Sequence, residues 1–354
     1  LGWKAENGKV VVSSSNVYFE LDKATGMVTS YKVNGTEFFD KAFGVQPNFW
    51  RAPNDNDYGK SNPKRLQIWK ESSRDFKVSD TAVREEGETV LMSVTYDLPV
   101  GNQYLITYRI YRDGVVNVNV KFTQTDREAE KTEVLEDTNL ATFTPGKKVK
   151  KKDVLEVPRI GVRFRIPYVM NRVEYFGRGP VENYVDRNAG SMVGRYKTSV
   201  EEMYVNYVRP QENGHRTDTR WVSFTNTAGR GLLVLAEKTI GFNALRNTVE
   251  DFDSEESSHP YQWRNRSPKE VAGKNEAEAK NVLRRMTHVN DITPRDFVEV
   301  CIDMKQQGVA GYDSWGAKVQ PGYTIPANRD YVWGFTLIPI KNVGDVNKSL
   351  RYTY

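Results

Sequence analysis

The sequence predicts an all-β fold in which two large antiparallel sheets pack face to face. Apolar and polar residues alternate with a period of two through much of the chain, as in half-buried strands. Aromatic residues, which favour strands, make up 12% of the chain. At least ten alternating segments are separated by Gly, Pro, Asn and Asp turns, whereas only residues 274–286 carry a convincing helical pattern. Because each sheet must cover one apolar face, we expect a sandwich.

The clearest predicted element is a hairpin of residues 103–111 and 115–122. Valines alternate with Asn and Lys in the second segment, which gives it one apolar face. The connection ends in Gly114, which can adopt positive φ. Residues 90–98 are expected to add a third strand. The same alternation predicts further strands at residues 10–22, 160–167, 172–177, 220–226, 231–237, 296–304 and 331–339.

Two polar segments, residues 125–152 and 249–275, break the alternation and are predicted to be long loops or insertions. Neither has the composition of a Gly/Ser linker, and no repeat of fixed period occurs. We therefore expect residues 1–354 to form a single domain. The chain begins without Met or a signal-like apolar stretch, which indicates a piece cut from a longer polypeptide.

Bulk composition excludes several classes of function. The 51 basic and 46 acidic residues nearly cancel to a net charge of +5, so nucleic-acid binding is not implied. The basic run 147–152 is interpreted as a solvated loop rather than a site for an anionic partner. Cys301 is the only cysteine, which excludes an internal disulfide and Cys/His zinc patterns. No apolar run approaches the roughly 20 residues of a membrane helix.

The segment Phe-Trp-Arg-Ala-Pro-Asn-Asp-Asn-Asp at residues 49–57 raises the question of a metal or carboxylate site. With Asp55 as first ligand, Gly59 takes the fifth place of a calcium loop and no Glu stands at the twelfth, so that interpretation fails. Asp55 and Asp57 remain a minor candidate for an acid and base pair. We favour a loop fixed by bonds between side chains and backbone.

Two further segments carry ionisable groups. In residues 175–187, Glu182 and Asp186 are available for acid/base chemistry, but we expect them to pair with Arg178 and Arg187 and hold a corner of the sheet. Residues 209–224 place Glu212, His215 and Asp218 before a strand. A single His in a turn is usually a structural hydrogen-bonding residue.

The segment 311–316 places Asp313 and Trp315 among glycines. Trp315 is either a core residue at the edge of a sheet or a stacking platform for a ring. No nucleotide-binding loop, serine-hydrolase elbow or zinc-protease helix pattern occurs in the chain, which excludes most templates for those enzymes.

Five motifs, in this order, resemble the C-terminal β-sandwich (small-chain) domain of glycoside hydrolase family 2 β-galactosidases. They are NFWRAPNDNDYG (48–59), YFGRGPVENYVDR (175–187), RPQENGHRTDTRWV (209–222), THVNDI (287–292) and GYDSWG (311–316). The resemblance covers residues 8–340. It implies an antiparallel supersandwich of the galactose mutarotase type, within a bacterial enzyme that hydrolyses terminal β-D-galactose residues of β-galactosides.

The resemblance also implies roles for particular residues. Trp315 is expected to stack on the aglycone, Asp313 and Gly59 to bind substrate, and the loop around Gly59 to lie near the mouth of the active site. It implies no catalytic residue here, because the acid/base and the nucleophile are glutamates of an upstream (β/α)₈ barrel. Ala310 and Tyr312 stand where the best-known members have Gly and Asp, and the insertion at 249–275 is longer, so the aglycone preference stays open.

Partners and cofactors follow from the same resemblance. The partners are a β-galactoside, the upstream barrel and sandwich domains, and further copies of the parent chain, with no nucleic acid or membrane. No cofactor is expected in this domain, and Mg and Na of the parent enzyme bind mainly elsewhere. The compartment, cytoplasmic or periplasmic, stays open. Two other functions remain possible: a mutarotase-like epimerase using His215 and Glu212, or a carbohydrate-binding module using Trp315, Tyr312 and Trp263.

Overall fold

The computed structural model describes residues 1–60, 62–124, 134–136, 148–150, 156–253, 288–313, 317–342 and 344–350. The predicted helix at 274–286 lies outside these residues, as do Trp263, Trp315 and most of the two predicted insertions.

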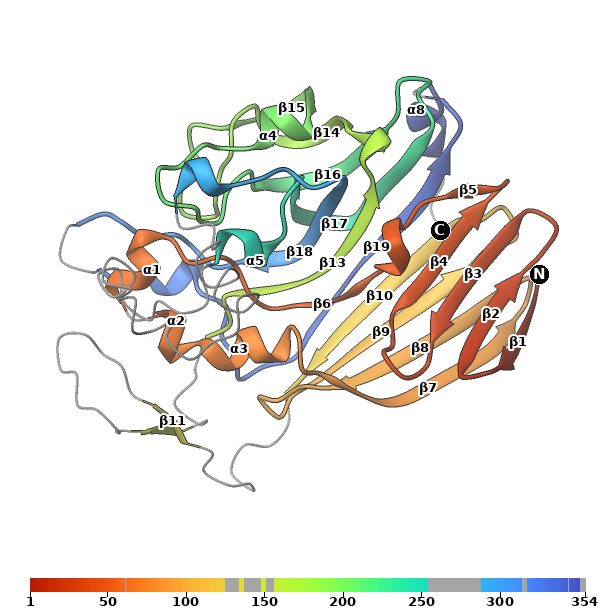
Figure 1. Cartoon of the computed structure of the whole chain (residues 1–354), viewed down its shortest axis with the longest axis horizontal. Helices are drawn as coiled ribbons and strands as arrows, with labels where there is room; N and C mark the ends of the chain where they lie inside the picture. Colours follow the sequence, from red (N-terminus) through yellow and green to blue (C-terminus); the bar gives the residue numbers. More distant parts are fainter. Residues whose placement is uncertain are drawn as a thin grey trace, which may run out of the picture.

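The chain begins with a small antiparallel sheet whose strands neighbour one another in sequence order (Figure 1). Its strands are β1 (Gly2–Glu6), β2 (Lys9–Ser13), β3 (Val17–Asp22), β4 (Val28–Val33) and β5 (Thr36–Glu37). Strand β3 alternates buried and half-buried residues, as the pattern of residues 10–22 predicts. The sheet therefore has one apolar face to bury.

The second sheet has twelve strands, nine of them in the order β15-β14-β16-β17-β19-β10-β9-β8-β7, with β6, β13 and β18 attached beside this path. The strands are β6 (Gln46–Asn48), β7 (Lys77–Glu86), β8 (Thr89–Asp97), β9 (Gln103–Ile110), β10 (Val116–Thr123), β13 (Arg159–Pro167), β14 (Arg172–Gly179), β15 (Met192–Ser199), β16 (Arg216–Thr225), β17 (Gly231–Leu245), β18 (Phe297–Gln306) and β19 (Tyr331–Ile340). A separate pair joins β11 (Val134–Glu136) to β12 (Lys148–Lys150).

Among the residues that the structure describes, helices are few and short. They are α1 (Asp55–Gly59), α2 (Asn62–Arg65), α3 (Gln67–Ser72), α4 (Val200–Met203), α5 (Val249–Phe252) and α8 (Asp345–Ser349), with 3₁₀ turns at Asp40–Ala42, Tyr168–Met170, Val289–Asp291 and Pro321–Tyr323. The all-β prediction with two antiparallel sheets is confirmed, as is the predicted hairpin, now β9 and β10. Strand β7 was missed because its residues are charged and mostly exposed.

Tyrosines join the small sheet to strands β8 to β10. The hydroxyl of Tyr31 donates to the carbonyl of Gly114 at 2.6 Å, and that of Tyr96 to the carbonyl of Gly26 at 2.6 Å. The ring centroids of Phe19 and Tyr108 lie 5.5 Å apart. A buried tyrosine needs a partner for its hydroxyl, so these bonds let aromatic side chains fill the interface between the sheets. The sandwich core is continuous across this interface.

The long strand β17 changes partner along its length. Its first half pairs with β19 and its second half with β18. Strand β18 ends at Gln306, and the loop that follows it runs toward α1, which Figure 1 shows at the end of the molecule away from β1 to β5. Strand β13 pairs with β18 on one side and with β6 on the other, so the end of β18 lies near the segment that follows β6.

Candidate functional site

Helix α1 contains the Asp/Asn segment that raised the question of a metal or catalytic loop. The side chain of Asn54 accepts from the backbone N–H of Asp57 at 2.8 Å, and the carboxylate of Asp57 accepts from the N–H of Asn54 at 3.2 Å. This reciprocal arrangement is a capping box, which satisfies free N–H groups of the first turn. The prediction of a segment fixed by side-chain-to-backbone bonds is confirmed, in the form of a short helix.

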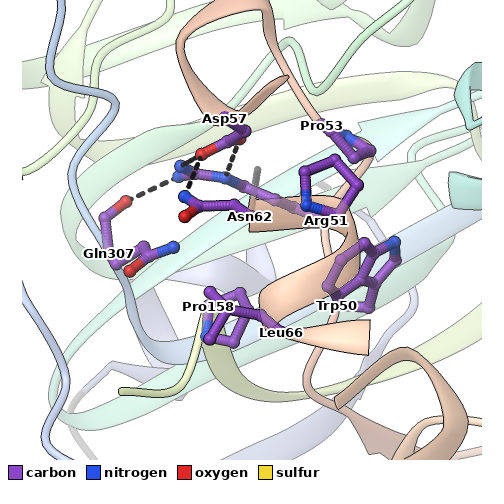
Figure 2. A pocket seen from close by; sticks show the side chains of 9 residues that line it. Trp50, Arg51, Pro53, Asp57, Asn62, Leu66, Pro158 and Gln307 are labelled. Carbon is purple, nitrogen blue, oxygen red and sulfur yellow. Dashed lines mark hydrogen bonds and ion pairs between the residues drawn. The ribbon is translucent and has the colours of Figure 1, made fainter. Parts of the chain in front are cut away.

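A buried arginine holds α1 against the end of β18. The side chains of Arg51 and Asp57 are 2% and 6% exposed, and they form a two-point pair with N–O distances of 3.1 and 2.8 Å (Figure 2). The same guanidinium donates to the carbonyls of Gln307 at 2.7 Å and Gly308 at 3.0 Å, and to the side chain of Gln306 at 3.2 Å. All five N–H groups of Arg51 are used. Burial alone would lower the pKa of Arg51, but Asp57, together with Glu212 and Tyr184, outweighs burial and raises this pKa.

Two more side chains fix the loop that follows β18. The carboxylate of Asp186 accepts from the backbone N–H groups of Val309 at 2.9 Å and Ala310 at 2.8 Å. The side chain of Asn56, on α1, donates to the carbonyl of Val309 at 2.9 Å. We call residues 307–313 the junction loop, because it joins β18, α1 and the corner that carries Asp186.

The predicted pairing of Glu182 and Asp186 with Arg178 and Arg187 is wrong. Arg178 pairs with Asp218, and Glu182 accepts from the backbone N–H of Gly214 at 2.8 Å. The carboxylates after the corner meet N–H groups of irregular segments, which have no sheet partner to bond. Backbone donors therefore take the place of the arginines.

The substrate-binding residues predicted from the sequence fall on both sides of this junction. Gly59 is the exposed last residue of α1, and a Cβ there would meet no atom within 4 Å. Asp313 is exposed at the end of the junction loop, where its carboxylate accepts from the N–H of Ala317 at 3.1 Å. Tyr312 is 62% exposed. The bond of Asn56 to Val309 joins these two elements, while Trp315 lies outside the described residues.

A crevice opens beside the buried arginine. Figure 2 shows the Arg51 and Asp57 pair on one side and Trp50, Leu66 and Pro158 on the other. Its cavity volume is about 10 Å³, room for about one water molecule and far below the ~300 to 1,000 Å³ of small-molecule pockets. The crevice is therefore too small to enclose a sugar by itself.

Glu212 and His215, the candidate pair for an epimerase, lie inside the sandwich. Glu212 is 5% exposed and accepts from Arg159 at 2.9 Å and Gln306 at 3.1 Å. His215 is 1% exposed and stacks on Tyr184. Burial, with Arg159 nearby, lowers the pKa of His215 well below its usual value. Because both side chains are shielded from solvent, this arrangement does not favour acid/base work on a sugar.

Sequence reasoning missed the groups that make the junction. Asn54 and Asp57 stand three apart, which is a capping-box spacing and was visible in the sequence. The partners of Asp186 are 123 and 124 residues away, so no local pattern could show them. Among the residues that the structure describes, no three His, Cys, Asp or Glu side chains gather into a possible metal site. No helix within the described ranges has the length and apolar character to cross a membrane.

Comparison with known proteins gives one consistent picture. A family model for the beta galactosidase small chain matches residues 13–337. A β-galactosidase of Priestia megaterium is 32% identical over 94% of this chain and 26% of its own length, and one of Streptococcus thermophilus is 27% identical over 93% and 27%. The chain thus spans about a quarter of the length of these relatives. A solved galactose mutarotase-like protein from Lactobacillus casei is 11% identical, with a TM-score of 0.44, over 94% of this chain and 100% of its own.

Proposed function

The chain belongs to the beta galactosidase small chain family, and we propose that it is the C-terminal domain of an enzyme that hydrolyses terminal β-D-galactose residues of β-galactosides. The observation that carries this proposal is the family match across residues 13–337. The names of the relatives and their greater length support it.

Within that enzyme, we assign this domain one wall of the sugar pocket. The wall consists of α1, with Gly59, and the junction loop, with Asp313. Trp315 follows two residues after Asp313 in the sequence and is proposed to stack on the aglycone. The support is geometric: the described part of the wall is pinned by buried groups, and its outer residues are exposed.

The catalytic carboxylates are proposed to lie in an upstream barrel. A retaining glycosidase needs two carboxylates about 5 to 5.5 Å apart and open to the sugar. At the junction, the carboxylate of Asp57 is taken up by Arg51 and that of Asp186 by backbone N–H groups, so neither is free for this work. Mg and Na ions of the parent enzyme are proposed to bind mainly in its other domains, as the family resemblance implies.

A hydrolysis assay of this chain and of the complete polypeptide, each with Trp315 and with Trp315→Ala, tests the proposal. The complete enzyme is expected to cleave a β-galactoside, whereas this chain alone gives no rate above a blank. Loss of stacking is expected to weaken binding by about 1 to 3 kcal/mol, mostly as a higher KM, since stacking acts on ground and transition states alike. Hydrolysis by the chain alone, or wild-type kinetics for Trp315→Ala in the complete enzyme, would overturn the corresponding part of the proposal.

A further inference from the structure

The junction loop is held by its carbonyls from one side and by its N–H groups from the other. Arg51 donates hydrogen bonds to the carbonyls of Gln307 and Gly308, and the side chain of Asn56 donates to the carbonyl of Val309. The carboxylate of Asp186 accepts hydrogen bonds from two successive backbone N–H groups, those of Val309 and Ala310. Asp186 is thus the anchor on the donor side of the loop.

The backbone at this anchor has an unusual conformation. Ala310 has φ of 55° and Gly311 has φ of 88°, so the chain makes a left-handed turn immediately after the bonded N–H groups. Successive N–H groups around such a turn form a concave site for an anion, and here the anion is a carboxylate of the same chain. Because L-residues other than Gly rarely adopt positive φ, Ala310 needs an external group to hold it there.

The packing at the anchor leaves little room. A Cβ at Gly308 would lie 2.4 Å from a carboxylate oxygen of Asp186, and a Cβ at Gly311 would lie 2.6 Å from the side-chain nitrogen of Asn56. Both anchoring side chains therefore touch the loop backbone itself. A hydrogen bond from a backbone N–H to a carboxylate is charge-assisted and about twice as strong as one between neutral groups.

We propose that Asp186 is a positioning residue for substrate, which sets the path of the junction loop and so the placement of the residues that contact the aglycone. The identity of the sugar rests on the proposed function. The positioning mechanism rests on the contacts of Asp186. Asp313 comes three residues after Ala310, and Trp315 comes two residues later. A misplacement of about 1 Å in a substrate-positioning group can cost a hundredfold in rate. Asp186 itself touches no reacting atom in this mechanism.

The test uses Asp186→Asn and Asp186→Ala in the complete enzyme. Hydrogen exchange of the peptide 307–313 reports the loop directly, and thermal unfolding reports global stability. Exchange of the Val309 and Ala310 amides is expected to quicken by about tenfold or more in Asp186→Ala, the scale of a lost charge-assisted bond. Asp186→Asn keeps one acceptor oxygen and should be intermediate. Asp296→Asn is the matched control, because Asp296 is an exposed carboxylate before β18, at the end of that strand opposite to the junction loop.

Kinetics then separate positioning from simple destabilisation. KM for lactose is expected to rise about fivefold to tenfold in Asp186→Ala with kcat changed less than about twofold. In a Trp315→Ala background, the same substitution should change KM much less, because both act on one contact. A merely structural role would instead lower the unfolding temperature and the active fraction, and leave KM unchanged.

Two outcomes distinguish this inference from the proposed function. If Trp315→Ala raises KM but Asp186→Ala changes neither KM nor amide exchange, Asp186 is not a positioning residue, while the proposed wall stands. If exchange quickens in Asp186→Ala and neither variant alters KM, the assigned substrate role of the loop is overturned together with the positioning of substrate.

Discussion

Two buried arginines, Arg51 and Arg159, sit in the same sandwich and are satisfied to very different degrees. Their side chains are 2% and 0% exposed. Arg51 uses every N–H group, on a carboxylate, a side-chain amide and two backbone carbonyls. Arg159 donates to Glu212 at 2.9 Å, to the carbonyl of Trp50 at 3.2 Å and to Asn243 at 3.3 Å. Its Nε lies 3.1 Å from a carboxylate oxygen of Asp303, in an ion pair that lacks the alignment of a hydrogen bond. Within the described chain, neither oxygen of Asp303 has a hydrogen-bond partner.

The Arg51 group fixes the path of the backbone, whereas the group of Arg159 and Asp303 responds to pH. The Arg51 group holds the junction loop against α1, so its role is to fix their relative position. In the Arg159 group, burial raises the pKa of Asp303 to about 7, with Arg159 opposing the shift. His215 lies beside Asp303, with its Nδ1 3.8 Å from a carboxylate oxygen and bonded to no described residue. Charged groups that lack hydrogen bonds in an apolar interior give up their charge more readily.

The largest expected effect comes from breaking the satisfied group. Arg51→Met removes five hydrogen bonds and leaves the carboxylate of Asp57 buried without its partner. The free energy of unfolding should fall by about 3 to 5 kcal/mol, the usual cost of an uncompensated buried charge. Urea unfolding measures it. The pair of half-buried Arg209 and exposed Asp55 serves as control, and Asp55→Asn should cost at most about 1 kcal/mol. Equal costs for both variants would remove the distinction drawn here.

The second expected effect concerns the unsatisfied group and pH. Because the pKa of Asp303 is raised in the folded state, folding takes up a proton between the unfolded pKa of about 3.9 and about 7. Its contribution to stability is therefore fully present at low pH and is lost as pH rises through 7. Relative to wild type, Asp303→Asn should gain up to about 1.4 kcal/mol per pH unit, or roughly 2 kcal/mol from pH 5 to pH 7, because the slope falls off as pH approaches the pKa. Urea titrations of both proteins at several pH values test this, and parallel curves would contradict it.

The third expected effect has the opposite sign. Burial lowers the pKa of His215 in the folded state. Below about pH 6.5 the unfolded chain therefore binds a proton at this residue that the folded chain does not bind, and the free energy of unfolding falls as pH falls. His215→Leu removes this loss, so the variant should gain on wild type by up to about 2 kcal/mol between pH 6.5 and pH 5. Denaturant midpoints across that range give the answer. A variant whose stability follows the wild-type pH profile would show that His215 titrates normally.

The sequence predicts the fold much better than it predicts the contacts around Arg51 and Arg159. Period-two alternation depends on neighbouring residues, so the order of residues along the chain is enough to locate strands such as β10. The short helix α1 was open to prediction through the spacing of Asn54 and Asp57. Contacts of Arg51 with Gly308, or of Asp186 with Val309, depend instead on how distant strands assemble. The family resemblance supplied Gly59, Asp313 and Trp315 as site residues, and local spacing alone would not have chosen them.

The smallest expected effect sharpens the comparison at the loop that Arg51 helps to hold. Ala310 has a φ of 55°, where an L-residue is strained by roughly 1 to 2 kcal/mol and Gly is not. Glycine also has a more flexible unfolded state, which offsets about 0.5 to 1 kcal/mol of the relief. Ala310→Gly should therefore stabilise the protein by up to about 1 kcal/mol in urea unfolding.

Ala228→Gly provides the matched control, because Ala228 lies in an exposed turn and is not at positive φ. That substitution should destabilise by about 0.5 to 1 kcal/mol, since it carries the entropy cost without relief of strain. Opposite signs for the two alanines would mean that the Arg51 and Asp186 contacts hold Ala310 in a conformation it would not choose alone. Equal losses would mean that the loop relaxes around residue 310, and that the satisfied arginine does not fix the backbone as tightly as its bonds imply.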